Sequence, residues 1–387
     1  MSLHSGSHHP ATVAVDLRAL VPEATGIGVY TRALLAELTA PERGKRTAGA
    51  AGAFRYLGLS QRPVREPAPL AAAGVALETQ PAPLGVVWQQ TRLPARLAAG
   101  DVDLFWSPLA TLPWRCPVPA VVTVHDLTAL LFPEAHTARV RWSILPFLGR
   151  SLAAARRVVA ISRATADDLA FHFPEARDRV RVVRNGVDPR FRPGDPEAIA
   201  ATRAALGAPR GYLLAVGTLE PRKNLPTLLT AWEALVAADP DFPPLVLVGA
   251  PGWESWSFRR RLAALAPLGL RHLGHVDDDR LLALYQAAAA FAYPSLYEGF
   301  GLPVLEAMAC GVPVVTSDVS SLPEVAGDAA LLVDPRDTRA LAHALRRLVE
   351  DPALAADLAA RGRARAAGFG WDRAAAGMEE VFREALG

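Results

Sequence analysis

The chain alternates short apolar runs with longer stretches of helical periodicity over nearly its whole length. Runs such as 11–17 (ATVAVDL), 120–126 (AVVTVHD) and 212–218 (YLLAVGT) show no apolar/polar alternation, which is typical of parallel strands covered on both faces. The other runs of this kind are 54–60, 102–107, 157–162, 244–250, 271–276, 290–295, 312–318 and 329–335. We therefore predict an α/β protein built on parallel sheets.

The stretches between these runs place apolar residues at helical spacing. They are 29–38, 141–155, 162–173, 224–238 and 278–289, two more helices after residue 335, and an amphipathic tail over 369–387. Such alternation predicts two consecutive doubly wound, Rossmann-like sheets. Right-handed crossovers place the loops that follow the strands at one edge of each sheet, where ligands bind. Two facing domains would then enclose a cleft.

The alternation stops at residues 179–198 (RVRVVRNGVDPRFRPGDPEA), where arginines, an Asn-Gly pair and repeated prolines predict a loop. A chain of 387 residues also exceeds one ordinary core. We predict an N-terminal domain over 11–190, a second domain over 191–368 and a terminal helix over 369–387.

Composition excludes several classes of protein. The net charge of +2 gives no reason to expect a nucleic-acid partner. Cys116 and Cys310 are too few for a disulfide framework or a zinc site, which favours a reducing, cytoplasmic location. No apolar run reaches the roughly 18 residues of a membrane span, and residues 1–10 lack the apolar core of a signal peptide. The Asp-rich runs 101–103 and 277–279 could suggest metal binding, but Asp before a helix is a usual N-cap, so we expect no metal.

The segment 216–224 (VGTLEPRKN) follows a predicted strand and opens a helix. Lys223 is one of two lysines in a chain whose other cations are arginines, which indicates either a need for a compact ammonium or chance. Gly217 permits a tight turn, and Arg222 with Lys223 at a helix N-terminus suits a diphosphate. The alternative is that both cations are solvated surface charges.

The segment 293–311 (YPSLYEGFGLPVLEAMACG) carries Glu298 and Glu306 in an apolar run, where carboxylates are costly unless paired. Glycines and a proline between them place Glu298 in a loop and Glu306 in the first turns of a helix that starts near Leu302. Carboxylates suit vicinal hydroxyls, and the accessible N–H groups of residues 299–302 suit phosphate or hydroxyl oxygens. The alternative is a surface Glu298 and a Glu306 that only complements the helix dipole.

Two weaker signals lie in the first half of the chain. Gly26 and Gly28 precede the first predicted helix, and turn geometry explains them as well as close approach of a phosphate does. His125 and Asp126 follow a predicted strand, as a site pair or as a packed histidine beside a capping aspartate.

In order and spacing these motifs resemble the retaining GT-B glycosyltransferases of family 4. That family carries an E-x7-E motif, here Glu298 to Glu306, G-x-x-x-x-R-K-N, here residues 217–224, and N-G-V-D, here residues 185–188. The resemblance runs from about Val13 to the C-terminus. H-D-L at His125 and G-I-G-V-Y-T resemble the mannosyltransferase-like branch, in which arginine usually stands where this chain has valine.

The resemblance implies a role for each matching residue. Arg222 and Lys223, beside Gly217, would bind the donor diphosphate, and Glu306 the ribose hydroxyls. Glu298 would contact the donor sugar, together with the amides of Phe300, Gly301 and Leu302. His125 would lie beside the sugar, and Gly28 beside the phosphates and the acceptor.

The resemblance also implies the reaction. A sugar would pass from a nucleotide-diphosphate sugar, GDP-mannose favoured over UDP-, ADP- or dTDP-sugars, to a saccharide or lipid-linked saccharide. Retention would follow from front-face attack, with the donor phosphate helping to deprotonate the acceptor, and no metal or other cofactor is needed. The tail helix would cross back to the first domain. A lipid-linked acceptor would bring the protein to the inner face of the membrane. The alternatives are a nucleotide-sugar epimerase or hydrolase of the same architecture, or a non-catalytic nucleotide-sugar-binding protein.

Overall fold

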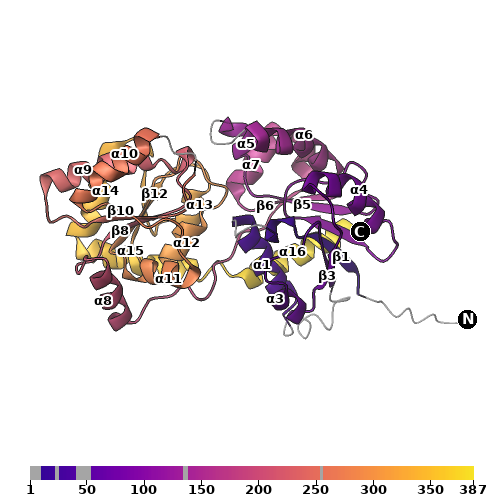
Figure 1. Ribbon diagram of the computed structural model, residues 1–387, viewed down its shortest axis with the longest axis horizontal. Helices are drawn as coiled ribbons and strands as arrows, with labels where there is room; N and C mark the ends of the chain where they lie inside the picture. The colour runs from indigo at the N-terminus through magenta and orange to yellow at the C-terminus, as the bar shows by residue number, and fades with distance from the viewer. Residues whose placement is uncertain (1–9, 22–25, 41–53, 134–137, 253–255) are drawn as a thin grey trace, which may run out of the picture. The chain divides into compact units, whose positions relative to one another are not determined.

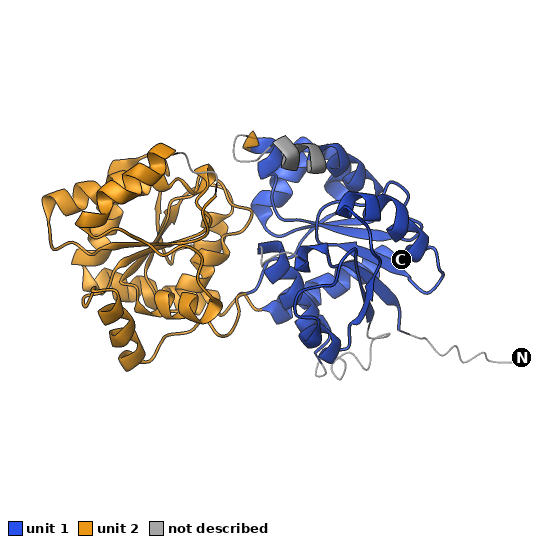
Figure 2. Cartoon of the chain, viewed as in Figure 1, with its two compact units in different colours: residues 1–131, 136–186, 371–387 blue, residues 132–135, 187–370 orange. Residues whose placement is uncertain are grey.

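The computed structural model describes residues 10–21, 26–40, 54–133, 138–252 and 256–387. The chain divides into two compact units (Figure 2). The first unit contains residues 1–131, 136–186 and 371–387, and the second contains 132–135 and 187–370. The main change of unit thus falls after residue 186, and the C-terminal helix belongs to the first unit.

The first unit holds a seven-stranded parallel sheet in the order β3-β2-β1-β4-β5-β6-β7. Its strands are β1 (Thr12–Asp16), β2 (Arg55–Ser60), β3 (Ala76–Thr79), β4 (Leu104–Ser107), β5 (Ala120–Val124), β6 (Arg157–Ala160) and β7 (Val180–Val182). β5 is buried along its entire length, which explains why its sequence does not alternate. The strand order reverses direction between β1 and β4, so this is the switch point where a ligand is expected.

Helices cover both faces of this sheet (Figure 1). α5, α6 and α7 lie on one face, and α1, α3 and α16 on the other. The helices are α1 (Gly26–Leu38), α3 (Pro67–Ala72), α4 (Gly85–Leu97), α5 (Thr128–Leu131), α6 (Ala138–Ala154), α7 (Arg163–His172) and α16 (Trp371–Leu386). In α16, Phe382 is fully buried and its ring lies 5.7 Å from that of Trp106 in β4. The predicted return of the tail helix to the first sheet is therefore confirmed.

The second unit holds a six-stranded parallel sheet in the order β10-β9-β8-β11-β12-β13. Its strands are β8 (Leu213–Val216), β9 (Leu245–Val248), β10 (Arg271–His272), β11 (Ala290–Tyr293), β12 (Val314–Ser317) and β13 (Leu331–Val333). Its switch point lies between β8 and β11. Both sheets thus have the doubly wound architecture that the sequence predicted.

The helices of the second unit also form two layers (Figure 1). α9 (Leu225–Ala238), α10 (Trp256–Leu265) and α14 (Thr338–Glu350) lie on one face, and α11 (Asp278–Ala287), α12 (Leu302–Ala309) and α15 (Pro352–Ala366) on the other. The other α-helices among the described residues of this unit are α8 (Pro196–Ala205) and α13 (Leu322–Ala326). In α14 the buried residues Leu341, Ala344, Leu345 and Leu348 recur at helical spacing and join the core under α9.

Two local predictions were wrong. The stretch 179–198 is not only loop, because it contains β7 and the start of α8. β7 is a three-residue edge strand in which Arg181 stands between two partly exposed valines, so its sequence lacks the unbroken apolar run of a buried strand. Gly26 and Gly28 do not precede the first helix but form the first turn of α1.

Candidate functional site

The predicted residues of the second unit converge at the switch point of its sheet. The loops after β8 and β11 lie side by side there, joined by a 2.8 Å hydrogen bond from the N–H of Leu296 to the carbonyl of Arg222. β8 and β11 are neighbours in the sheet, and their crossovers lead to opposite faces. An opening between the two loops is the usual ligand site of such a sheet.

The loop after β8 is shaped by Asn224. Its backbone is left-handed (φ 55°), which asparagine tolerates better than most residues. Its side-chain amide donates to the carbonyls of Pro294 (3.1 Å) and Pro335 (2.6 Å), and α9 begins at the next residue. The 3₁₀ turn over Pro221–Lys223 thereby directs Lys223 inward, where it is only 9 % exposed. The alternative of a solvated lysine is wrong.

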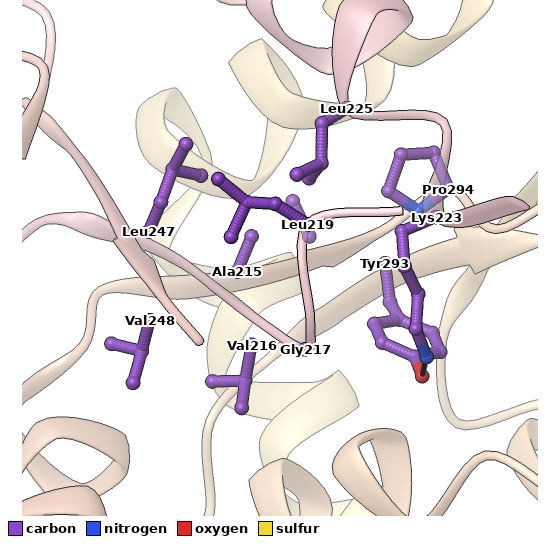
Figure 3. A pocket seen from close by; sticks show the side chains of 11 residues that line it. Ala215, Val216, Gly217, Leu219, Lys223, Leu225, Leu247, Val248, Tyr293 and Pro294 are labelled. Carbon is purple, nitrogen blue, oxygen red and sulfur yellow. Dashed lines mark hydrogen bonds between the residues drawn. The ribbon is translucent and has the colours of Figure 1, made fainter. Parts of the chain in front are cut away.

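Glu298 lies between the two cations. Its Oε1 is 2.7 Å from the Nζ of Lys223, and its Oε2 is 2.6 Å from the Nη1 of Arg222. Arg222 also pairs with Glu220 at 2.6 Å, and the Nζ of Lys223 donates to the hydroxyl of Tyr293 at 2.5 Å (Figure 3). Glu298 is 6 % exposed, so it is not the surface residue of the alternative interpretation.

These contacts fix the charge of Glu298. Burial on its own would raise the pKa of this carboxyl, but Arg222 and Lys223 outweigh that effect and lower the pKa to about 2. Burial lowers the pKa of Lys223; Glu298 opposes that shift, and Arg222 adds to it. Glu298 is therefore ionised at neutral pH and is a weak base, which suits it to accept hydrogen bonds and not to remove protons.

The loop after β11 presents free backbone donors. Its carbonyls are held by two serines: the carbonyl of Glu298 accepts from the hydroxyls of Ser320 (2.5 Å) and Ser321 (2.8 Å). Within the described residues, the N–H groups of Phe300, Gly301 and Leu302 have no protein acceptor. Since α12 begins at Leu302, these donors and the helix dipole favour an oxygen-rich or anionic ligand.

Glu306 lies in a different environment. It follows in the second turn of α12 and accepts a 2.8 Å hydrogen bond from the hydroxyl of Tyr285 in α11. Burial raises its pKa to about 7; the bond from Tyr285 opposes this, and the nearby carboxylates Asp278 and Asp188 add to it. Glu306 is thus close to half ionised at neutral pH, whereas Glu298 is fully ionised. The two acids therefore differ both in their partners and in how readily they ionise.

Glycine is required where the strand ends crowd together. Gly217 has φ 146°, and a Cβ there would lie 3.1 Å from the Cε of Lys223. A Cβ on Gly249, at the end of β9, would lie 2.0 Å from the carbonyl oxygen of Gly217. The small cavity beside Lys223 is walled mainly by apolar side chains, including Leu219 and Leu247 (Figure 3). Close packing beneath the loop after β8 therefore leaves its backbone little room to move.

The first unit holds the other two predicted site residues. The Nε2 of His125 lies 2.9 Å from the carbonyl of Pro108, so it carries the proton, and the ring meets Tyr30 edge-on at 4.7 Å. Burial lowers the pKa of His125 to about 4, so it is neutral at pH 7. Gly28 is buried in the first turn of α1, two residues before Tyr30.

The aspartates considered in the sequence as metal ligands or as a partner of His125 serve as caps and ion pairs. Asp126 accepts from the N–H and the hydroxyl of Thr128, which confirms the capping interpretation. Asp277 caps α11 through the N–H of Arg280. Asp101 pairs with Arg96 at 2.6 Å.

The sequence alone did not point to Tyr293 or Tyr285, nor to the two serines that donate to the carbonyl of Glu298. Tyr293 ends a strand that runs into the switch point, a position that could have revealed it. Tyr285 could not be found without knowing that α11 packs against α12. Ser320 and Ser321 follow β12, and only the sheet order shows that this strand lies beside β11.

Comparisons with known proteins cover most of the chain. Residues 24–191 match the family described as Glycosyltransferase Family 4, and residues 201–365 match Glycosyl transferases group 1. O-antigen chain mannosyltransferase B of Escherichia coli is 39 % identical over 258 residues, which is 65 % of this chain and 67 % of that protein. D-inositol 3-phosphate glycosyltransferase of Salinispora arenicola is 37 % identical over 320 residues, covering 76 % of this chain and 71 % of that protein.

Solved structures share the fold. Sucrose-phosphate synthase from Thermosynechococcus elongatus superposes with a TM-score of 0.73 at 23 % identity, over 96 % of this chain and 98 % of that one. HepE of Anabaena in complex with UDP-glucose gives a TM-score of 0.72 at 21 % identity, over 96 % and 99 %. The GT-B fold predicted from the resemblance is confirmed. Among the described helices, none is both long and apolar enough to cross a membrane.

Proposed function

The chain belongs to the family 4 glycosyltransferases, in their mannosyltransferase-like branch, and on that premise we propose that it transfers mannose from a nucleotide-diphosphate sugar with retention of configuration. The acceptor is a saccharide or a lipid-linked saccharide. One observation carries the proposal: two cations and three backbone N–H groups, which have no acceptor in the part of the chain that the structure describes, gather at the switch point of the second sheet. That set of donors matches a sugar diphosphate.

Lys223 and Arg222 bind the donor diphosphate in this proposal. Breaking the glycosidic bond leaves additional negative charge on the diphosphate, and fixed cations stabilise that charge as it forms. Lys223 has three N–H groups, of which Glu298 and Tyr293 accept two; within the described residues the third has no acceptor. The N-terminus of α12 adds its own donors and dipole from the loop after β11.

The two glutamates bind hydroxyl groups at different positions on the donor. Glu306, with one hydrogen bond from Tyr285, accepts from the ribose hydroxyls. Glu298 accepts from hydroxyls of the transferred sugar. Its pKa of about 2 makes it too weak a base to activate an acceptor. We propose instead that the donor phosphate takes the proton as the acceptor oxygen bonds to the anomeric carbon and the bond to the diphosphate breaks; attack on the face of the leaving group then retains the configuration.

The first unit provides the acceptor side. His125 is neutral and contributes hydrogen bonding beside the sugar, and Gly28 lets the phosphates and the acceptor approach the backbone of α1. The relatives are named for an O-antigen chain and for inositol 3-phosphate, so both acceptor classes are candidates. We place the enzyme in the cytoplasm, where a lipid-linked acceptor would draw it to the inner face of the membrane. We propose no metal and no further cofactor.

A donor panel tests the proposal. The protein is incubated with GDP-mannose and with UDP-, ADP- and dTDP-sugars, each with and without saccharide, lipid-linked saccharide and inositol 3-phosphate acceptors. We expect nucleoside diphosphate release that depends on both GDP-mannose and an acceptor. The anomeric configuration of the product, read by NMR, tests retention.

Other results would favour the alternatives. Sugar release without any acceptor would indicate a hydrolase, and interconversion of the donor sugar would indicate an epimerase. Donor binding without turnover under every condition would indicate a binding protein. An inverted product would contradict the retaining mechanism while leaving the transferase assignment intact.

A further inference from the structure

We propose that Tyr293 is a positioning residue for Lys223: its phenol oxygen holds the ammonium in the place where the donor diphosphate binds. The proposal rests on the proposed function only in giving Lys223 the diphosphate as its ligand. The geometric claim, that the hydroxyl of Tyr293 fixes and supports the charge of Lys223, is testable without any sugar donor.

Tyr293 is itself rigidly held. It is the last residue of β11, is 3 % exposed and pairs with Thr316 of β12. Its carbonyl accepts a 2.9 Å hydrogen bond from the hydroxyl of Thr316, and its ring stacks on Phe291 at 5.8 Å. A phenol fixed in this way is a stationary anchor.

Lys223 needs such an anchor. Its side chain is long and flexible, and its ammonium ends 2.5 Å from the hydroxyl of Tyr293 and 4.8 Å from the centre of the ring (Figure 3). Its other partner, Glu298, is also the residue proposed to bind the sugar. Tyr293, which also hydrogen-bonds Glu298, is the partner of the ammonium to which no contact with the donor is assigned.

The anchor is also electrically neutral. Burial, and then the negative charge of Glu298, raise the pKa of Tyr293 well above its ordinary value, so the phenol keeps its proton. The charged groups that face Lys223 are Glu298, Arg222 and Glu220, two acids and one other cation. A further carboxylate in place of the phenol would repel a diphosphate, whereas a neutral oxygen supports the ammonium without that cost.

The scarcity of lysine allows a direct test. Only Lys45 and Lys223 are lysines, so Lys45→Arg in a protein labelled with ¹⁵N-lysine leaves a single side-chain ammonium signal. We expect Tyr293→Phe, which removes one oxygen and keeps the ring, to lower the pKa of Lys223 by about one unit. Tyr212→Phe is the matched control, because it removes a buried hydroxyl of the same unit that donates to the carbonyl of Leu284 at 2.7 Å.

The same variants are then compared for binding and turnover. We expect Tyr293→Phe to weaken binding of inorganic pyrophosphate about tenfold in calorimetry. We also expect the alkaline limb of kcat/KM to move to lower pH, whereas Tyr212→Phe leaves both unchanged. A Lys223 pKa that is the same in Tyr293→Phe and in the Lys45→Arg background would overturn the proposal. Lack of sugar transfer by the unmodified protein would instead refute the proposed function, because the NMR titration needs no turnover.

Discussion

Lys223 and Glu298 form a nearly buried ion pair of 2.7 Å although 75 residues separate them in the chain. The pair joins the loop after β8 to the loop after β11 and so holds the two sides of the switch point of the second sheet together. Removing one partner of a buried ion pair strongly destabilises a protein, because the charge of the other partner is left buried and uncompensated. The same contact thus serves stability and the proposed donor site, and the two effects can be measured separately.

Glu298→Gln tests how much the ion pair contributes to the stability of the fold. The carboxyl has a pKa of about 2 when folded, below its ordinary value, so its stabilising contribution is present above about pH 4.5 and is lost as pH falls towards 2. We expect the variant to lose about 3 kcal/mol of unfolding free energy at pH 7. Urea unfolding at several pH values measures the loss, which should shrink below pH 4.5. A loss that does not depend on pH would contradict the assignment.

Lys223→Ala tests the proposed contact between the ammonium and the donor diphosphate. Glu298 keeps Arg222 as a partner, so the protein should stay folded. Losing one contact to the developing charge costs about 2.7–4 kcal/mol of transition-state stabilisation, and we expect kcat to fall roughly 10²–10³-fold. Arg346→Ala, on the exposed face of α14, is the matched loss of a surface cation. Near-normal turnover by a folded Lys223→Ala protein would rule out the diphosphate contact.

Glu306→Gln tests the ribose contact through pH. The pKa of Glu306 is about 7, so its carboxylate form, the better hydrogen-bond acceptor, grows as pH rises from 6 to 8. Nucleoside diphosphate affinity should therefore increase over this range in the unmodified protein. The diphosphate itself also titrates, but it does so equally with both proteins, and calorimetry of the variant supplies that baseline. Identical pH dependence in the two would argue against a ribose contact.

The sequence predicted the architecture because parallel strands buried on both faces leave unbroken apolar runs. The edge strands β3 and β7 were not predicted, because their partly exposed residues, such as Arg181, do not form an apolar run. The motif spacing predicted which residues meet at the second switch point. It could not show that Glu298 binds both cations, because that contact depends on the neighbouring positions of β8 and β11 in the sheet.

Gly249→Ala tests how tightly the loop after β8 is supported. The added Cβ would lie 2.0 Å from the carbonyl oxygen of Gly217, and the φ of 151° is unfavourable for alanine. We expect the loop to shift and pyrophosphate affinity to fall at least tenfold, with the second unit still folded. Gly100→Ala, which also has positive φ but open space around it, controls for backbone strain. Equal pyrophosphate binding by both variants would show that the packing is not limiting.

Phe382→Ala tests the packing of the terminal helix on the first sheet. The ring is fully buried against Trp106 and Phe54, at 5.7 Å and 5.6 Å. Truncating a buried phenylalanine costs about 3–5 kcal/mol, so calorimetry should show a lower melting temperature for the first unit. Glu380→Ala, an exposed change on the same helix, should leave it unchanged. A loss below about 1 kcal/mol would mean that α16 is only loosely attached.

The position of α16 also has a consequence for biosynthesis. Residues 371–386 cover β4, β5 and β6, yet the whole second unit is translated before them. During translation the part of the sheet over β4, β5 and β6 therefore lacks its covering helix while some 180 residues are added, counting from 187 to 370. Exposed apolar sheet surface is a hazard for aggregation during that interval. Chaperone demand in the cell should thus depend on the speed of translation through the second unit.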